Sequence, residues 1–244
     1  YAFFGCSSLQ SITIPDIITN IGTGAFQSCS SLTSIKIPNN VTKIDSYTFK
    51  ECNSLQSITI PDSVTSIGCS TFEGCSSLTN VYYTGTIENW CNIAFCYYYS
   101  IYSISSSDSN PMHEAERFYM LDSNNKYYEV TEIEIPNTIT TIGFYQFHGF
   151  ENVTRITIPD SVTTIEYGAF EKCSSLESIT LPFVGKTLHG TENTYFGYIF
   201  GASSRSYNSN YVPSSLKEVI ITGGTTIGNN AFYGCSSLQS ITIP

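Results

Sequence analysis

The chain has 244 residues, of which 41% are hydrophobic and only 12% are charged, and its formal net charge at pH 7 is −10. This acidic balance disfavours binding to the phosphate backbone of nucleic acids. No apolar run is long enough to span a bilayer, and no signal peptide begins at Tyr1.

A unit of 23 residues recurs along the chain. The spacing of 23 separates successive members of three sets, which are Leu9, Leu32, Leu55 and Leu78, then Pro15, Pro38 and Pro61, and finally Phe26, Phe49 and Phe72. A fixed period of this length indicates a stacked solenoid. One unit cannot bury its own apolar residues, so each unit needs its neighbours.

The unit from Leu55 to Ser77 shows the pattern with little disturbance. Alternation in 58–60 predicts a short strand whose isoleucines point into the stack and whose Thr59 points out. Pro61 ends the ladder because it has no N–H to donate. Val64 and Ile67 mark a second short extended piece, after which Gly68 lets the chain turn. Phe72 and Cys75 are expected to fill the interior from the opposite wall.

Two interruptions break the register. The unit at Leu78 is degenerate, but Trp90 and Phe95 fall at apolar offsets, so we expect both in the core. The next unit starts at Val130, which leaves residues 96–129 as a first insertion. The unit opening at Leu176 runs for 40 residues before Leu216 restarts the pattern, so we place a second insertion at about 183–213. We expect residues 1–244 to be a single solenoid, a fragment of a longer protein cut mid-repeat at both ends.

The first insertion combines acidic residues with a run of tyrosines. We expect a helical turn at 111–116 and a hairpin that pairs 118–121 with 127–130. The acidic residues fit a solvated loop, or a contact surface for a basic partner or a cation. Tyr97, Tyr98 and Tyr99 favour the contact surface, because tyrosine offers a large contact area at a low entropy cost. The second insertion is also aromatic, and we expect about half of its aromatic residues to pack against the solenoid.

Six of the nine cysteines share one repeat position, and they are Cys6, Cys29, Cys52, Cys75, Cys173 and Cys235. This placement predicts a ladder of small buried residues. Parallel Cβ directions argue against disulfides within the ladder. Cys69, Cys91 and Cys96 lie off the ladder, and a pair among them stays open. No C-x-x-C occurs, so the sequence gives a zinc site no support.

Catalytic chemistry finds little support. His113, His148 and His189 are not at metal-ligand spacing, and we expect each at the surface; no nucleophile elbow and no P-loop occur. Glu132 and Glu134 flank one strand residue and could in principle do acid/base work. Arg155 occupies the place of Glu132 one unit later, so a cross-strand ion pair is the simpler account. We therefore assign no catalytic residue, no metal ligand and no cofactor.

The outward strand positions remain as the candidate site. Stacked in successive units, they predict one broad, hydroxyl-rich sheet face, and solenoid faces of this kind commonly bind partners. Its distinctive central patch lies beside the first insertion. The predicted binding surface consists of Asn80, Tyr82, Glu132, Glu134, Arg155 and Thr157, together with Tyr97, Tyr98 and Tyr99.

The repeat resembles a known family. The segments Ile60 to Leu78 and Ile158 to Leu176 closely resemble the BspA-like leucine-rich repeats of bacterial and protozoan surface proteins. The resemblance implies a β-rich solenoid, a right-handed leucine-rich repeat superhelix of about eight 23-residue units with short strands, little helix and two insertions. It also implies an extracellular or cell-surface location and adhesion to host or cell-surface proteins. The family has no shared catalytic residues to carry over.

Three functions are compatible with these observations. The first is a non-enzymatic module for adhesion and protein binding, acting through its strand face and insertions. The second is a passive structural spacer that presents other domains of a larger surface protein. The third is a carbohydrate-binding module, which the aromatic insertions allow. We expect no nucleic-acid partner and no membrane span in this chain.

Overall fold

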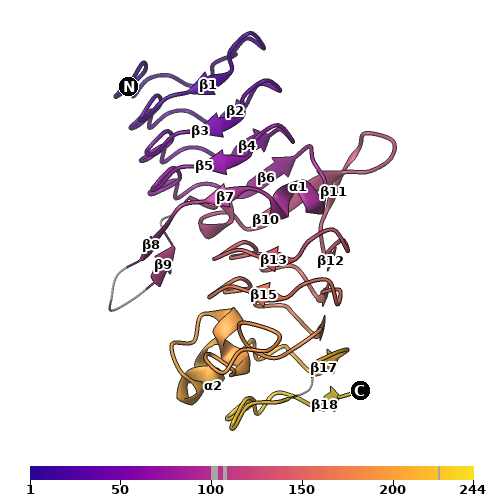
Figure 1. Cartoon of the computed structure of the whole chain (residues 1–244). Helices are drawn as coiled ribbons and strands as arrows, with labels where there is room; N and C mark the ends of the chain where they lie inside the picture. Colours follow the sequence, from indigo (N-terminus) through magenta and orange to yellow (C-terminus); the bar gives the residue numbers. More distant parts are fainter. Residues whose placement is uncertain (100–103, 107–108, 225) are drawn as a thin grey trace. The chain divides into compact units, whose positions relative to one another are not determined.

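The structure is a computed structural model that describes residues 1–99, 104–106, 109–224 and 226–244, without the side chains of residues 98, 99 and 104–106. The chain forms two compact units, Tyr1–Val130 and Thr131–Pro244. Each is rich in short strands with little helix (Figure 1). The strand-rich repeat fold with parallel sheets confirms the coarse fold prediction. The handedness and the number of repeat units stay predictions.

The first unit contains two sheets of stacked strands, parallel except where β11 pairs antiparallel with β10 (Figure 1). One sheet has the order β1-β3-β5-β7, with bounds Asn20–Ile21, Lys43–Ile44, Ser66–Ile67 and Ala94–Phe95. The other has the order β11-β10-β6-β4-β2, with bounds Tyr127–Glu129, Arg117–Leu121, Asn80–Tyr83, Ser57–Ile60 and Ser34–Lys36. A separate hairpin pairs β8 (Tyr97–Tyr99) with β9 (Ile104–Ser106). Helix α1 spans Ile87–Cys91, and a 3-10 turn, η1, spans Pro111–His113.

The second unit also contains two sheets of stacked strands. Its main sheet has the order β12-β14-β16-β17-β18, all parallel, with bounds Glu132–Glu134, Arg155–Thr157, Ser178–Leu181, Glu218–Ile221 and Ser240–Thr242. A second sheet pairs β13 (Thr141–Ile142) with β15 (Thr164–Ile165). The second insertion folds into η2 (Phe196–Phe200), η3 (Arg205–Tyr207) and α2 (Asn208–Tyr211).

Three side-chain ladders hold successive coils together. Aromatic rings stack, with centroids 5.7 Å apart for Phe26–Phe49 and 5.8 Å for Phe49–Phe72. Thiols of the ladder cysteines donate to backbone oxygens of the preceding coil, as Cys52 Sγ does to Phe26 O at 3.1 Å. Threonine hydroxyls also donate to carbonyl oxygens 23 residues earlier, as in Thr65 Oγ1 to Thr42 O at 3.2 Å. The period of the sequence is thus the period of the contacts.

Each regular coil needs a left-handed backbone residue just before its cysteine position. The φ angle is 76° at Gly74 and 63° at Lys172, which occupies the same place in another coil. Glycine adopts this conformation without steric cost, whereas other residues store strain there.

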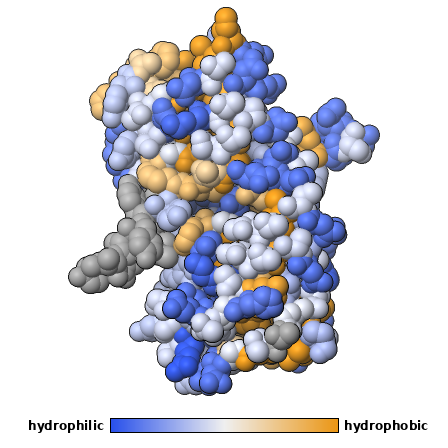
Figure 2. Space-filling model, viewed as in Figure 1, coloured by the Kyte–Doolittle hydropathy of each residue, from blue (hydrophilic) through white to orange (hydrophobic). Residues whose placement is uncertain are grey.

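The N-terminal coil has a neighbouring coil on one side only. Figure 2 shows hydrophobic surface at the top of the view, over this coil. Ile18 is 37% exposed there, whereas Val41 and Val64, which occupy the same repeat position in the next two coils, are buried. Burial of a repeat residue therefore depends on the coil beside it.

The degenerate unit at Leu78 differs from the register that we predicted. Trp90 is fully buried, as expected, but it belongs to α1. Phe95 is also in the core, yet it pairs with Ile67, 28 residues earlier, and not with the phenylalanine position. The reason is that α1, with Thr86 as its N-cap, adds residues before the second extended piece.

The second insertion supplies a missing ladder residue. Phe200 lies 6.5 Å from Phe170, centroid to centroid, and Phe170 N donates to Ile199 O at 2.8 Å. In regular coils the corresponding backbone bond runs to the residue before the next ladder phenylalanine, as from Phe147 N to Ala169 O. Of the six aromatic residues from Tyr195 to Tyr211, Phe196, Tyr198 and Phe200 are buried, which confirms the expectation that half of them pack inward.

Candidate functional site: the strand faces of the two units

The predicted binding surface is divided between two sheets. Asn80 and Tyr82 lie on β6 of the first unit, whereas Glu132 and Glu134 lie on β12 and Arg155 and Thr157 on β14 of the second. The prediction of one continuous strand face is wrong, because β6 pairs with β10 from the first insertion. Asn80 has Arg117 as its partner in register, not Glu132.

Strand β10 occupies a repeat position that the sequence period did not reveal. Its register with β6 aligns Phe118 with Val81 and Met120 with Tyr83, and all four side chains are buried. The offset is 37 residues, not 23. The alternation in Phe118 and Met120 was a usable signal, but it lacks the leucine and isoleucine of the repeat. The expected hairpin is confirmed, since β10 and β11 pair antiparallel, and η1 confirms the expected helical turn.

Three tyrosines gather on the outward face of this sheet, and we call Tyr82, Tyr119 and Tyr127 the tyrosine cluster. Tyr82 stacks on Tyr119 with ring centroids 5.0 Å apart and meets Tyr127 edge-on at 4.9 Å. Tyr127 is 37% exposed, and the other two are half-buried. Burial, followed by the neighbouring Tyr82, raises the pKa of the Tyr127 hydroxyl, so this ring is neutral near pH 7.

Hydroxyl, amide and charged groups surround the tyrosine cluster. In register, one row runs Lys36, Thr59, Tyr82 and Tyr119, and the next runs Ser34, Ser57, Asn80 and Arg117. Arg117 Nη1 lies 3.9 Å from Glu129 Oε2, and contact with Tyr119 followed by the charge of Glu129 raises the pKa of the guanidinium. The face thus presents aromatic area beside exposed cations. Such a combination suits recognition of a protein surface, where tyrosine and arginine anchors dominate binding energy.

The second unit presents an acidic group instead. Arg155 Nε lies 3.9 Å from Glu132 Oε1, with the two side chains 56% and 67% exposed, which confirms the predicted cross-strand ion pair. Exposed pairs of this kind contribute little to stability. Ser178 on β16 donates to Glu218 Oε2 at 2.8 Å. Glu132, Glu134 and Arg155 therefore form a solvated charge pattern.

The tyrosine run begins a hairpin. Tyr97, Tyr98 and Tyr99 form β8, and Tyr97 is 41% exposed. The side chains of Tyr98 and Tyr99 lie outside the described residues, so the contact role of this run stays a prediction.

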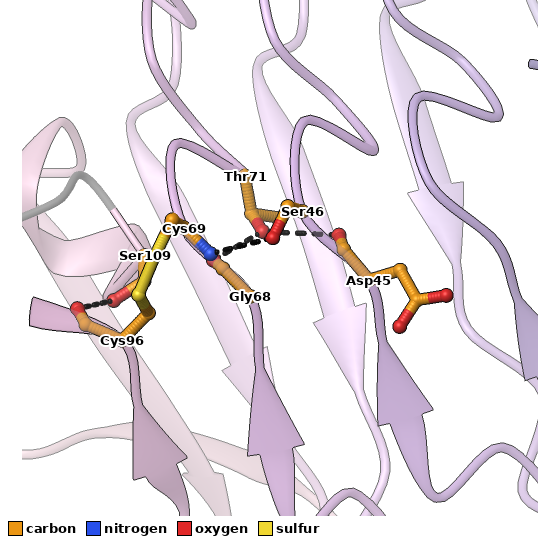
Figure 3. The surroundings of a disulfide bond; sticks show 7 residues. All are labelled: Asp45, Ser46, Gly68, Cys69, Thr71, Cys96 and Ser109. Atoms are coloured by element: carbon orange, nitrogen blue, oxygen red, sulfur yellow. Dashed lines mark hydrogen bonds between the residues drawn. A yellow bond between two sulfur atoms is a disulfide. The ribbon is translucent and has the colours of Figure 1, made fainter.

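A disulfide joins Cys69 to Cys96 at the base of that hairpin (Figure 3). Their Cα atoms are 5.0 Å apart. Cys69 N donates to Ser46 Oγ at 3.1 Å, and Cys96 O accepts from Ser109 Oγ at 2.8 Å, so both ends are fixed by hydrogen bonds. The sequence left the pairing open among three cysteines. The structure selects this pair and leaves Cys91 as a buried thiol, and burial raises its pKa to about 12.

The ladder cysteines are free thiols, as predicted, and four of them are fully buried, namely Cys29, Cys52, Cys75 and Cys173. Among the described residues, no three histidine, cysteine or acidic side chains gather as a metal site would require. One expectation is wrong. His148 is only 2% exposed, because its position follows the ladder Phe147 and Tyr145 packs against it with centroids 6.0 Å apart.

No helix in the described part of the chain has both the length and the apolar character needed to cross a membrane.

Comparison with known proteins places the repeat in a family. The family profile described as "BspA type Leucine rich repeat region (6 copies)" matches residues 1–124, 121–200 and 202–244. The search of curated proteins gave no match.

Similar solved structures are bacterial leucine-rich repeat proteins. One from Bacteroides ovatus ATCC 8483 has 26% identity and a TM-score of 0.45, and the match covers 93% of this chain and 53% of that one. This chain therefore spans about half the length of that protein. A leucine rich cell surface protein from Faecalibacterium prausnitzii A2-165 has 23% identity and a TM-score of 0.35, covering 99% and 74%. The T. pallidum leucine-rich repeat protein has 20% identity and a TM-score of 0.35, covering 91% and 72%.

Since the family profile covers nearly every residue, from the first coil to the last, the chain belongs to the BspA-type leucine-rich repeat family.

Proposed function

We propose that this chain is a non-enzymatic protein-binding module that acts at the surface of a cell or outside it, and that the tyrosine cluster is its main contact. Leucine-rich repeat proteins generally bind other proteins, and the family is defined by a repeat fold rather than by an enzyme class. The single observation that carries the proposal is the packing of the half-buried Tyr82 and Tyr119 with the exposed Tyr127 on the outward face of the sheet.

The physical support comes from how such a face would bind. Tyrosine rings held against one another lose little rotamer freedom when a partner covers them. Arg117 and Lys36 flank the cluster and would attract an acidic rim on the partner. The second unit would add a weaker contact made by Glu132, Glu134, Arg155 and Thr157. Because the charges of Glu132 and Arg155 are exposed, this contact would change the association rate more than the affinity.

The chemistry of the cysteines supports the proposed location of the chain, at the cell surface or outside the cell. The Cys69–Cys96 disulfide is typical of an oxidising compartment. Four of the ladder thiols, Cys29, Cys52, Cys75 and Cys173, are protected there by burial, which keeps them protonated and unreactive.

The proposal is tested by affinity capture of extracellular proteins on the full chain, followed by binding curves with each purified partner. We expect the double variant Tyr82→Ala/Tyr119→Ala to weaken binding at least tenfold. Tyr233→Ala is the matched control, because Tyr233 is 59% exposed and lies off the strand face. A triple variant of Glu132, Glu134 and Arg155 to Ala should change mainly the association rate.

Two results would reject this assignment. Equal losses for Tyr233→Ala and for the double variant would mean that the tyrosine cluster is not the contact. Absence of any captured partner would favour the alternative, a passive spacer that presents other domains of a larger surface protein.

A further inference from the structure

The 40-residue coil that opens at Leu176 builds an ordered lobe on the second unit, drawn around α2 in Figure 1. Asn208 is fully buried at its centre. Its Oδ1 accepts from Gly197 N at 3.0 Å, and its Nδ2 donates to Ala231 O at 2.9 Å, so it joins η2 to the following coil. Tyr195 Oη donates to Ala202 O at 3.0 Å. These bonds fix the lobe by buried polar contacts, so its surface is preorganised.

A groove of about 410 Å³ lies where this lobe meets the turn that follows Phe170. The turn contributes Glu171 and Lys172, and the lobe contributes Phe200, Ser209, Asn210 and Tyr211. The volume falls within the range of small-molecule sites. Regular coils lack the 17 extra residues of this unit, so the groove exists only because of the insertion.

The lining of the groove has a defined chemistry. Tyr211 is 41% exposed, so much of its ring is open to a ligand. Glu171 and Lys172 carry opposite charges, so the groove has no net charge from its ionised groups. Serine and asparagine side chains provide both donors and acceptors. Phe200 is buried and adds apolar surface.

A glycine leaves space for the carboxylate of Glu171, which lines the groove. Gly201 follows η2 with φ at 92°, and a Cβ atom placed there would lie 2.8 Å from Glu171 Oε2. The absence of a side chain at Gly201 thus makes room for that oxygen.

From this lining we infer that the groove is a binding site for a neutral saccharide of one or two pyranose units. A pyranose ring has an apolar C–H face that packs on an aromatic ring, and its hydroxyl groups bond to carboxylate, amide and hydroxyl side chains. A charge-balanced groove gives no net attraction to an anionic or a cationic ligand. The residues that line the groove include none of the strand-face residues, so it is a second binding activity and does not rest on the tyrosine cluster.

The experiment uses the full 244-residue chain on a printed array of neutral, sialylated and sulfated oligosaccharides, followed by titration with the neutral glycan that binds best. We expect binding to neutral glycans. Tyr211→Ala should lower the affinity at least tenfold, and Asn210→Ala several-fold. The matched control is Tyr207→Ala, because Tyr207 is 50% exposed on the same lobe but does not line the groove.

Gly201→Ala supplies an independent check, since Gly201 does not line the groove and a methyl group there, besides straining a backbone with φ at 92°, displaces the Glu171 carboxylate. We expect it to weaken saccharide binding while thermal unfolding stays cooperative. Tyr82→Ala/Tyr119→Ala should leave saccharide binding unchanged, so failure of this site and failure of the proposed protein contact are separate results. Silence on the neutral glycans, binding confined to sialylated or sulfated glycans, or equal losses for Tyr207→Ala and Tyr211→Ala would each overturn the inference.

Discussion

At the cysteine position of the repeat, one small side chain both fills a buried corner of the coil and donates a hydrogen bond to the preceding coil. Cys29, Cys52, Cys75 and Cys173 are fully buried, and each thiol donates to a backbone oxygen 26 residues earlier, at 3.1 to 3.3 Å. An alanine would fill less of the corner and donate nothing. The spacing in the sequence predicted the burial. It could not predict the hydrogen bond, because the accepting oxygen belongs to a different repeat position.

The ladder thiols should react in order of burial. Burial raises the pKa of Cys52 to about 12 and that of Cys235 to about 11, so both are protonated at pH 8. Cys6 is exposed. We expect iodoacetamide at pH 8 to label Cys6 first, Cys235 more slowly and Cys52 only after unfolding, as measured by peptide mass spectrometry. Labelling of Cys52 at the rate of Cys6 would contradict the buried ladder.

The same thiols should make the fold sensitive to alkali. In the unfolded chain a thiol ionises near pH 9.0, whereas the pKa of Cys52 in the fold is about 12. Its contribution to stability is therefore complete below pH 9 and is lost as the pH rises from there towards 12. We expect the free energy of unfolding to fall more steeply above pH 9 in the natural chain than in Cys52→Ala, as measured by urea titration. Cys6→Ala is the control and should follow the natural chain.

At the scale of single elements, the sequence predicts the local strands and turns, but it does not predict which strands pair. The strands at 57–60 and 66–67, the hairpin of β10 and β11 and the turn η1 all match expectation. The 23-residue period does not predict that β10 pairs with β6. It also does not predict the five-residue shift that α1 introduces in the pairing of Ile67 with Phe95. Both features lie where the chain departs from the 23-residue period. Strand pairing there depends on contacts between residues that are distant in the sequence.

The phenylalanine ladder should carry much of the stability of the first unit. Phe49 is fully buried between Phe26 and Phe72, so Phe49→Ala should lower the free energy of unfolding by about 3–5 kcal/mol. Phe3 is 37% exposed, so Phe3→Ala should cost clearly less. Denaturant unfolding followed by circular dichroism measures both. Equal losses would show that stacking on two sides adds nothing.

The disulfide should stabilise the first unit by constraining the unfolded chain. Its partners are 27 residues apart, and a loop of that length corresponds to about 3.5 kcal/mol. We expect Cys69→Ala/Cys96→Ala to lose stability of this order, with Cys91→Ala as a control that retains the bridge. Peptide mapping without reductant should recover Cys69 linked to Cys96. A map that links Cys91 instead would refute the assignment.

At the scale of the whole molecule, the two compact units differ in the chemistry of their strand faces. The first presents the tyrosine cluster with Lys36 and Arg117, and the second presents Glu132, Glu134 and Glu218 around Arg155. The sequence supplied Asn80, Tyr82 and the acidic group as candidates. Tyr119 and Tyr127 entered only through the sheet register, since nothing in the period marks them as neighbours of Tyr82.

The overall charge gives a prediction for the complete chain. With a net charge of −10 and a sequence pI of about 4.6, the protein should not bind duplex DNA at neutral pH. An electrophoretic mobility assay at low and physiological salt should show free DNA at every protein concentration. Retardation of the DNA that weakens with added salt would mean that a local basic surface overrides the net charge.

The sequence alone determined the coil, because identical residues at a fixed spacing must stack to bury their apolar side chains, and this requirement can be read without knowing any contact. It thereby identified the buried phenylalanines, the cysteine ladder, Trp90 as core and the family. The tertiary structure decided which strand follows β6, which cysteine pairs with Cys69, where Phe200 enters the ladder and how the lobe forms a groove. These features lie in aperiodic segments, where pairing depends on three-dimensional proximity and no repeat spacing predicts it.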